Sequence, residues 1–251
     1  MIMEKPMTPT RKPRVSPVRL VLLLLLALLL PLSALAYNKN RVATDANGQP
    51  LHISGSVVII EPDIELSEVL AGGVTEPRRE WTQAARRLYP AAVRSRLTGA
   101  SKTLVPDYRI PVDLPPASRM GQIIRLNEAV SMSVLAYSSP GNQLATKGKR
   151  LDWTLGPGVE ELRKATGADY ALFTYMRDSY TSAGRKALRV VGLLLLGGDI
   201  GGGSQIGVTT LVDLRTGQVV WFNFLAKQTG DLRDEQGASA TVNNMLQGLP
   251  L

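Results

Sequence analysis

The stretch Leu-Val-Asp-Leu-Arg-Thr-Gly-Gln-Val-Val-Trp at residues 211–221 decides the fold, because it is typical of two antiparallel strands joined by a tight turn. β-branched and aromatic residues flank Arg215-Thr216-Gly217, and a glycine in a three-residue loop suits a type I turn followed by a bulge. The pattern predicts strands over 208–214 and 218–225. Two further strands are expected at 168–176 and, as a short buried run, at 56–60.

Helical patterns surround these strands. A helix that opens at 75–77 has an apolar side formed by Trp81, Ala85, Leu88 and Ala92, and Pro90 should kink it. Other helices are predicted over 117–137, 157–166 and 235–246, and an apolar run covers 183–196.

Strands and helices in this order predict an α/β fold, with a mixed sheet, helices packed on it and a β-hairpin followed by a C-terminal helix. The apolar stripes around Trp81 and Ile123 are expected to cover the same face of that sheet. Residues 53–251 would form this single domain, and the polar segment 37–52 would be a flexible lead-in.

The N-terminus has the pattern of an export signal. Basic residues lead into the apolar run Leu20–Leu32, and Ala34-Leu35-Ala36 then forms a cleavage site with small residues. The run is shorter than the roughly 20 residues that a spanning helix needs. Residues 1–36 are therefore predicted to be a signal peptide, cleaved near Ala36-Tyr37 to release a periplasmic or exported chain. The alternative is an uncleaved inner-membrane signal anchor.

Composition argues against several classes of function. About half of the net charge of +8 lies in residues 1–36, so the mature part has no nucleic-acid footprint. The chain has no cysteine, and its single histidine, His52, lies in a predicted loop, so we expect no metal site, no cofactor and no catalytic residues. The protein is therefore predicted not to be an enzyme.

The second half of the chain resembles a known group of exported domains. Gly-Ala-Asp-Tyr at 167–170 leads from a short helix into a strand, and the hairpin at 211–221 precedes the last helix. In this respect residues 157–247 resemble periplasmic α/β domains of the curli-assembly-transporter type, and the related TolB N-terminal and penicillin-binding-protein-activator lipoprotein domains. The resemblance implies an exported, non-enzymatic domain that binds envelope partners or oligomerises. The absence of a lipobox cysteine departs from the secretion channel of that group.

Two features are candidates for an interaction surface. Four arginines on the polar side of the first helix could meet anionic lipid or an acidic partner. The apolar run and the glycine-rich stretch after it, 190–203, could present apolar surface to a partner or a bilayer. We therefore expect an envelope protein that binds a partner or self-associates, and the alternative is a membrane-associated oligomer or pore component that uses 190–203. The candidate residues are Arg79, Arg86, Arg87, Arg94, Leu194, Leu195, Gly201, Gly202 and Gly203.

Overall fold

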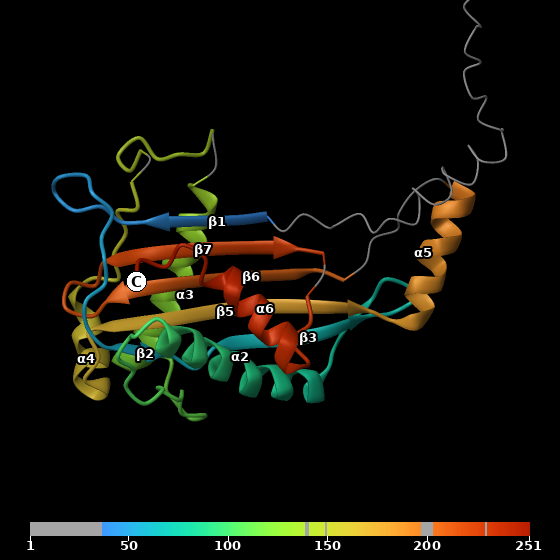
Figure 1. Cartoon of the computed structure of the whole chain (residues 1–251), viewed down its shortest axis with the longest axis horizontal. Coiled ribbons are helices and arrows are strands. Elements are labelled where there is room, and N and C mark those ends of the chain that lie inside the picture. Colours follow the sequence, from blue (N-terminus) through green and yellow to red (C-terminus); the bar gives the residue numbers. More distant parts are fainter. Residues whose placement is uncertain (1–36, 139–140, 149, 197–202, 229) are drawn as a thin grey trace, which may run out of the picture. The chain divides into compact units, whose positions relative to one another are not determined.

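β5 (Tyr170–Thr181) is the central strand of a seven-stranded mixed sheet in the computed structural model of the chain (Figure 1). The sheet runs in the order β1-β7-β6-β5-β3-β4, and β2 pairs with the first part of β5. β2 and β3 lie parallel to β5, whereas β6 is antiparallel to β5 and to β7. The other strands are β1 (Tyr37–Val42), β2 (Val57–Ile59), β3 (Asp63–Val69), β4 (Thr75–Pro77), β6 (Gln205–Asp213) and β7 (Val219–Lys227).

The structure describes residues 37–138, 141–148, 150–196, 203–228 and 230–251, and for 191–196 it describes the backbone alone. The predicted signal peptide, Gly201 and Gly202 lie outside these ranges. Within them the helices are α2 (Arg79–Gly99), α3 (Arg119–Ala136), η1 (Pro157–Val159), α4 (Glu160–Thr166), α5 (Ala183–Leu196) and α6 (Glu235–Met245). The predicted α/β class, with a mixed sheet and a hairpin followed by a C-terminal helix, is confirmed.

The sheet separates two hydrophobic cores. One contains Leu88 and Tyr89 of α2 and Val242 of α6, and Figure 1 shows these two helices on the same side of the sheet. The other contains Ile123 of α3 and Leu162 of α4. The expectation that the stripes around Trp81 and Ile123 share one face is therefore wrong.

The connection between α2 and α3 explains this correction. Leu104 bridges to Val57 and Tyr108 bridges to Ile60, so this proline-rich segment runs beside β2 as an extended chain. This extended segment leads from α2 on one face of the sheet to α3 on the other face. The hydrophobic periodicity of the two helices does not predict on which face each helix lies.

The lead-in also differs from expectation. Residues Tyr37–Val42 form β1, an edge strand that pairs with β7 over its whole length. The side chain of Asn38 donates to the Asn244 carbonyl at 2.7 Å and that of Lys39 to the Ser138 carbonyl at 2.6 Å, so both faces of β1 are attached. Long-range contacts of this kind stabilise a polar strand that has no apolar alternation of its own.

Pro90 lies inside α2, which continues through it from Arg79 to Gly99.

No described helix is long and apolar enough to cross a membrane.

The predicted hairpin is confirmed, and its turn depends on Gly217. This residue has φ 78°, and its amide donates to the Asp213 carbonyl at 2.8 Å. A β-carbon placed there would lie 2.2 Å from the Gly156 carbonyl oxygen. Both the left-handed backbone and the close approach therefore require glycine.

We expect Gly217→Ala to destabilise the protein more than Gly48→Ala. Both glycines have a left-handed φ, which costs another residue about 1–2 kcal/mol, but a β-carbon at Gly48 meets nothing within 4 Å. Urea unfolding of the two variants measures the difference. Equal losses of unfolding free energy would show that the contact with Gly156 is unimportant.

Candidate functional site: an open sheet face beside a small cleft

The register of the strands places two rows of side chains on the α3 side of the sheet. One row runs from Asp63 through Tyr175, Val208 and Phe224 to Lys39. The next row runs from Glu65 through Arg177, Ile206 and Ala226 to Tyr37. We call these two rows the open half-face.

The described helices leave part of the open half-face uncovered. Ile206 is 43% exposed although it lies on a central strand, and Tyr37 is 55% exposed. The Tyr37 and Phe224 rings meet edge to face, with centroids 6.1 Å apart. In contrast, Thr210, four residues after Ile206 on β6, donates to Asn127 of α3 at 2.8 Å. The α3 helix therefore covers the row of Thr210 and also Val208, which is 3% exposed, so the uncovered part of the open half-face is centred on the row of Ile206.

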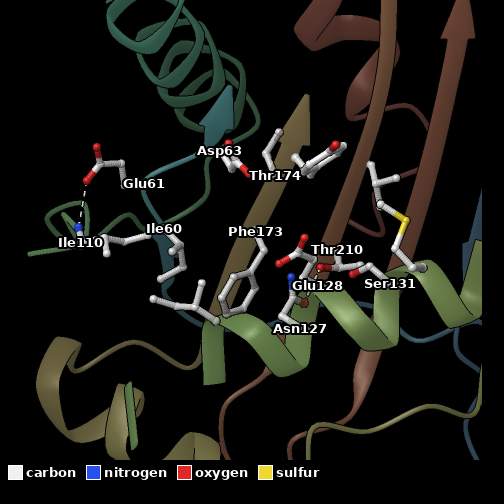
Figure 2. Close-up of a pocket in the computed structure, with 14 residues that line it drawn as sticks. Ile60, Glu61, Asp63, Ile110, Asn127, Glu128, Ser131, Phe173, Thr174 and Thr210 are labelled. Atoms are coloured by element: carbon white, nitrogen blue, oxygen red, sulfur yellow. Dashed lines mark hydrogen bonds between the residues drawn. The ribbon is translucent and has the colours of Figure 1, made fainter. Parts of the chain in front are cut away.

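A small cleft lies at the boundary between α3 and the open half-face (Figure 2). Its cavity volume is about 80 Å³, and apolar side chains such as Ile60, Ile124 and Phe173 line its inner part. Ser131 of α3 also lines it, and its buried hydroxyl has no hydrogen-bond partner among the described residues. A cleft of this size admits one side chain or a small chemical group.

Acidic side chains surround this cleft. Glu61 accepts from the Ile110 amide at 2.8 Å, and Glu128 lies on the exposed side of α3 (Figure 2). Asp63 forms a two-point ion pair with Arg177, with both N–O distances 3.0 Å. The Arg177 guanidinium also lies 4.2 Å from the centroid of the Tyr175 ring. The β3 end of the open half-face is thus rich in carboxylates, with Arg177 as a cation among them.

Helix α5 lies in the connection between β5 and β6. These strands are antiparallel neighbours, so a tight turn would be enough to join them. Residues 182–204 lie between them instead. In Figure 1, α5 extends beyond the ends of these strands. The side chains of Leu188 and Val190 are 46% and 58% exposed, and the described residues of α5 belong to neither core. Exposed apolar side chains on an inserted helix are typical of a contact surface.

The four predicted arginines of α2 are all exposed. Arg86 donates to the Ile64 carbonyl at 3.2 Å, and Arg94 forms an ion pair with Asp107. Arg86, Arg87 and Arg94 line one shallow groove, and Arg79 and Arg86 line another. The structure therefore brings them onto one accessible helix side, and their role in binding stays a prediction.

The predicted residues after β5 have different outcomes. Leu194 and Leu195 lie in α5, although their side chains are outside the described part, as are Gly201 and Gly202 entirely. The Gly203 amide donates to the Thr181 hydroxyl at 2.7 Å, and a β-carbon there would lie 2.0 Å from the Ser179 carbonyl oxygen. Gly203 therefore has a structural reason to be glycine, namely the close approach of the two strand ends.

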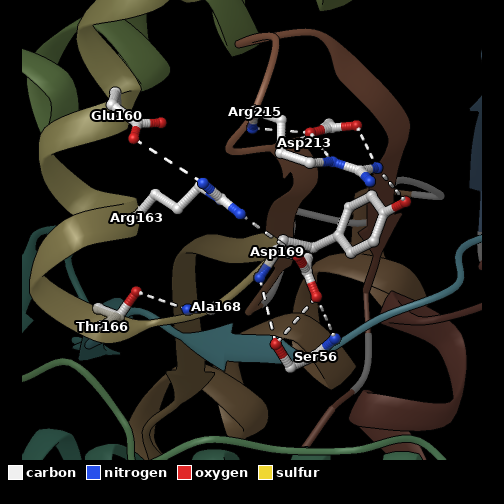
Figure 3. A network of polar contacts seen from close by, with 9 residues as sticks. Ser56, Glu160, Arg163, Thr166, Ala168, Asp169, Asp213 and Arg215 are labelled. Atoms are coloured by element: carbon white, nitrogen blue, oxygen red, sulfur yellow. Dashed lines mark hydrogen bonds and ion pairs between the residues drawn. The ribbon is translucent and has the colours of Figure 1, made fainter.

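A polar network at the opposite end of β5 holds the sheet together (Figure 3). Asp169 accepts from the amide and hydroxyl of Ser56, at 3.0 and 3.2 Å, and lies 4.0 Å from Arg163. The hydrogen bonds from Ser56, with the nearby guanidinium groups of Arg215 and Arg163, lower the pKa of Asp169. These contacts connect the residues directly before β2 and β5 with α4, so their role is to stabilise the fold.

A second polar cluster lies near the start of α5, where Asp178 is only 2% exposed. The Tyr180 hydroxyl donates to the Asp178 carboxylate at 2.5 Å and Gln205 donates at 2.6 Å. The Tyr180 oxygen in turn accepts from the Leu232 amide at 2.8 Å. Burial raises the pKa of Asp178 to about 6, with Asp231 adding to the rise and Lys227 opposing it.

The raised pKa of Asp178 predicts a pH dependence of stability. The folded protein holds this proton up to about pH 6, whereas the unfolded chain loses it near 3.8. The contribution of Asp178 to the unfolding free energy is therefore largest below pH 4, and about 3 kcal/mol of it is lost as the pH rises to 6.

We expect Asp178→Asn to remove this part of the pH dependence. Urea unfolding of both proteins at pH 4, 5, 6 and 7 isolates the Asp178 contribution from that of other carboxylates, such as Asp169, whose effect has the opposite sign. Parallel stability curves for the two proteins would contradict the assignment.

The described residues contain no group of three or more histidine or acidic side chains that could hold a metal ion.

Comparison with solved structures gives remote likenesses. Neither a protein-family model nor a curated protein matches the sequence. Among solved structures, a PelC dodecamer from Paraburkholderia phytofirmans is 11% identical and has a TM-score of 0.39, with 84% of this chain and 95% of that chain covered. A variant PelC dodecamer from the same organism is 12% identical, with a TM-score of 0.37 and coverage of 84% and 96%. Likenesses this remote support no conclusion about what the present chain binds or how it assembles.

Sequence reasoning missed the open half-face and the cleft. The sequence of β6 contained one signal, because Ile206 and Val208 alternate with Gly207 and therefore share one face of the sheet. The sequence does not specify where α3 crosses the sheet, and this crossing decides which rows of side chains the helix covers.

Proposed function

We propose that the mature chain is an exported, non-enzymatic module of the cell envelope that works by binding a protein partner or by self-association. The observation that supports this most directly is the open half-face. Ile206 lies on a strand that is paired on both sides, yet 43% of its surface is exposed. An apolar sheet face is normally covered by another layer, so a second protein surface is the natural cover.

Export is supported by the relation between the sequence and the fold. The predicted cleavage site at Ala36-Tyr37 lies immediately before β1, whose first residue is Tyr37. Removal of residues 1–36 would leave all the described strands and helices intact. A signal peptide that ends where the first strand begins suits a domain that folds after export.

Mass spectrometry of the protein from its native envelope fraction tests the export half of the proposal. We expect a chain that begins at Tyr37 and that is extracted without detergent. An intact N-terminus, or a need for detergent, would contradict cleavage and favour the signal anchor.

The assembly half is tested with Ile206→Asp. A charge at this position should lower the fraction of chain found above monomer mass in size-exclusion light scattering of the extract, because it places a carboxylate in the apolar contact. Val112→Asp is the control, because Val112 is fully exposed in a loop. Equal behaviour of the two variants, or substrate turnover by the purified protein, would contradict the proposal.

A second candidate function is favoured by α5. This helix has Leu188 and Val190 exposed, and its first turns carry Arg185, Lys186 and Arg189 and no acidic residue. Basic and apolar residues on one helix are typical of contact with an anionic membrane surface. The alternative is therefore a membrane-associated oligomer or pore component.

Liposome flotation tests this alternative. If it holds, the mature protein floats with vesicles that contain anionic lipid, and Leu194→Asp combined with Leu195→Asp abolishes flotation because two carboxylates oppose insertion. Lys164→Glu on the exposed side of α4 serves as a control for general charge effects. Absence of flotation for the unmodified chain would exclude the membrane-associated alternative.

A further inference from the structure

We propose that α5 of one copy packs across the open half-face of a second copy, so that the inserted helix of each chain covers the sheet that another chain leaves exposed. This inference rests on the proposed self-association and names its interface. The starting observation is that, among the described residues, Ile206 on the sheet and Leu188 and Val190 on α5 are apolar side chains that stay exposed.

The local structure prevents α5 from covering its own sheet. Ser182 is the single residue between β5 and α5, and its amide donates to the Val69 carbonyl at 3.0 Å. In the first turn, Arg185 donates to the Ala71 carbonyl at 3.3 Å. These bonds hold the start of α5 beside the connection between β3 and β4, beyond the strand ends (Figure 1). Folding back onto the same sheet would break them, so α5 of a second copy is a better cover for the open half-face than α5 of the same chain.

The dimensions of the two surfaces agree. The open half-face spans β3, β5, β6, β7 and β1, which at about 4.8 Å per strand spacing is about 19 Å wide. The 14 residues of α5 form a helix about 21 Å long. A single α5 laid across the strands, beside α3, therefore reaches from one side of the open half-face to the other.

Charge fixes the direction of this helix. Its N-terminal half carries Arg185, Lys186 and Arg189, whereas the sequence from Val190 to Leu196 has only apolar residues and glycine. On the sheet, Asp63 and Glu65 of β3 lie beside Arg177, with Glu61 just before β3 and Glu128 on α3 close by, and Ile206, Ala226 and Tyr37 follow towards β1. The basic turns thus meet the carboxylates, and the apolar turns meet the apolar part of the rows. Burial of Leu188 and Val190 against this surface supplies the hydrophobic contribution.

The absence of cysteine from the chain allows a direct test. Leu188→Cys and Ile206→Cys are prepared as separate mature proteins of different mass, mixed, and treated with a short bismaleimide linker. Each chain then has one thiol, so a heterodimer reports only contact between copies. We expect about tenfold more heterodimer than from Leu188→Cys mixed with Val112→Cys, because an interface raises the effective concentration of the two thiols.

Three cross-linking results would overturn the inference. The first is a 188–206 yield equal to that of the 188–112 control. The second is a dominant 206–206 product, which would mean that two open half-faces pack together. The third is an internal link within monomers of the doubly substituted Leu188→Cys, Ile206→Cys chain, which would mean that α5 covers its own sheet.

A charge exchange gives a second measurement that leaves the apolar residues intact. Lys186→Glu should raise the dissociation constant of the assembly, and Glu65→Lys added to the partner copy should restore association. Lys164→Glu on α4 is the matched control, with the same charge change on an exposed helix away from the interface. Failure of the rescue would contradict the proposed direction of α5.

The outcomes separate the interface from the function. An assembly seen by light scattering without the 188–206 link would overturn this inference and leave the proposed function standing. A mature chain that stays monomeric at all concentrations, with no cross-link, would overturn the interface together with self-association.

Discussion

The structure depends on the pairing of β5, because this strand is hydrogen-bonded along both of its long sides. β2 and β3 share one side and β6 occupies the other. The two ends of β5 carry polar networks, one around Asp169 and one around the buried Asp178. Since β5 separates both cores, its position determines which side chains face α2 and which face α3.

The two faces of the sheet are not equally covered. On one face α2 and α6 contact each other and the sheet, so that Trp221, Met245 and Tyr89 are fully buried. On the other face α3 covers the sheet only in part, because Val208 in the row of Tyr175 is 3% exposed whereas Ile206 in the next row is 43% exposed. A domain of this size has enough residues to cover both faces. Residues Ala183–Leu196 instead form α5, whose described residues belong to neither core.

Local signals explain how much of this fold the sequence could predict. The turn at Gly217 and the amphipathic period of α2 each act within a few residues, and both predictions were confirmed. The strand identity of 37–42 depends on contacts with Ser138 and Asn244, which are about 100 and 200 residues distant, so composition suggested a flexible lead-in. The face that α3 covers follows from the path of residues 103–108 along β2, which no periodicity encodes. For the candidate site, the sequence indicated that α5 is apolar and that the α2 arginines are exposed, but the open half-face became visible only from the strand register.

Hydroxyl-radical footprinting of the mature chain at low and high concentration tests the central claim, that the open half-face is covered by assembly, most directly. The side chains of Tyr37, Tyr175 and Ile206 should be oxidised in dilute protein and become protected as the concentration rises. Trp81, which packs on the opposite face, should keep a constant rate of oxidation. Protection of Trp81 without protection of Ile206, or unchanged oxidation of all four residues in an assembled sample, would contradict the account.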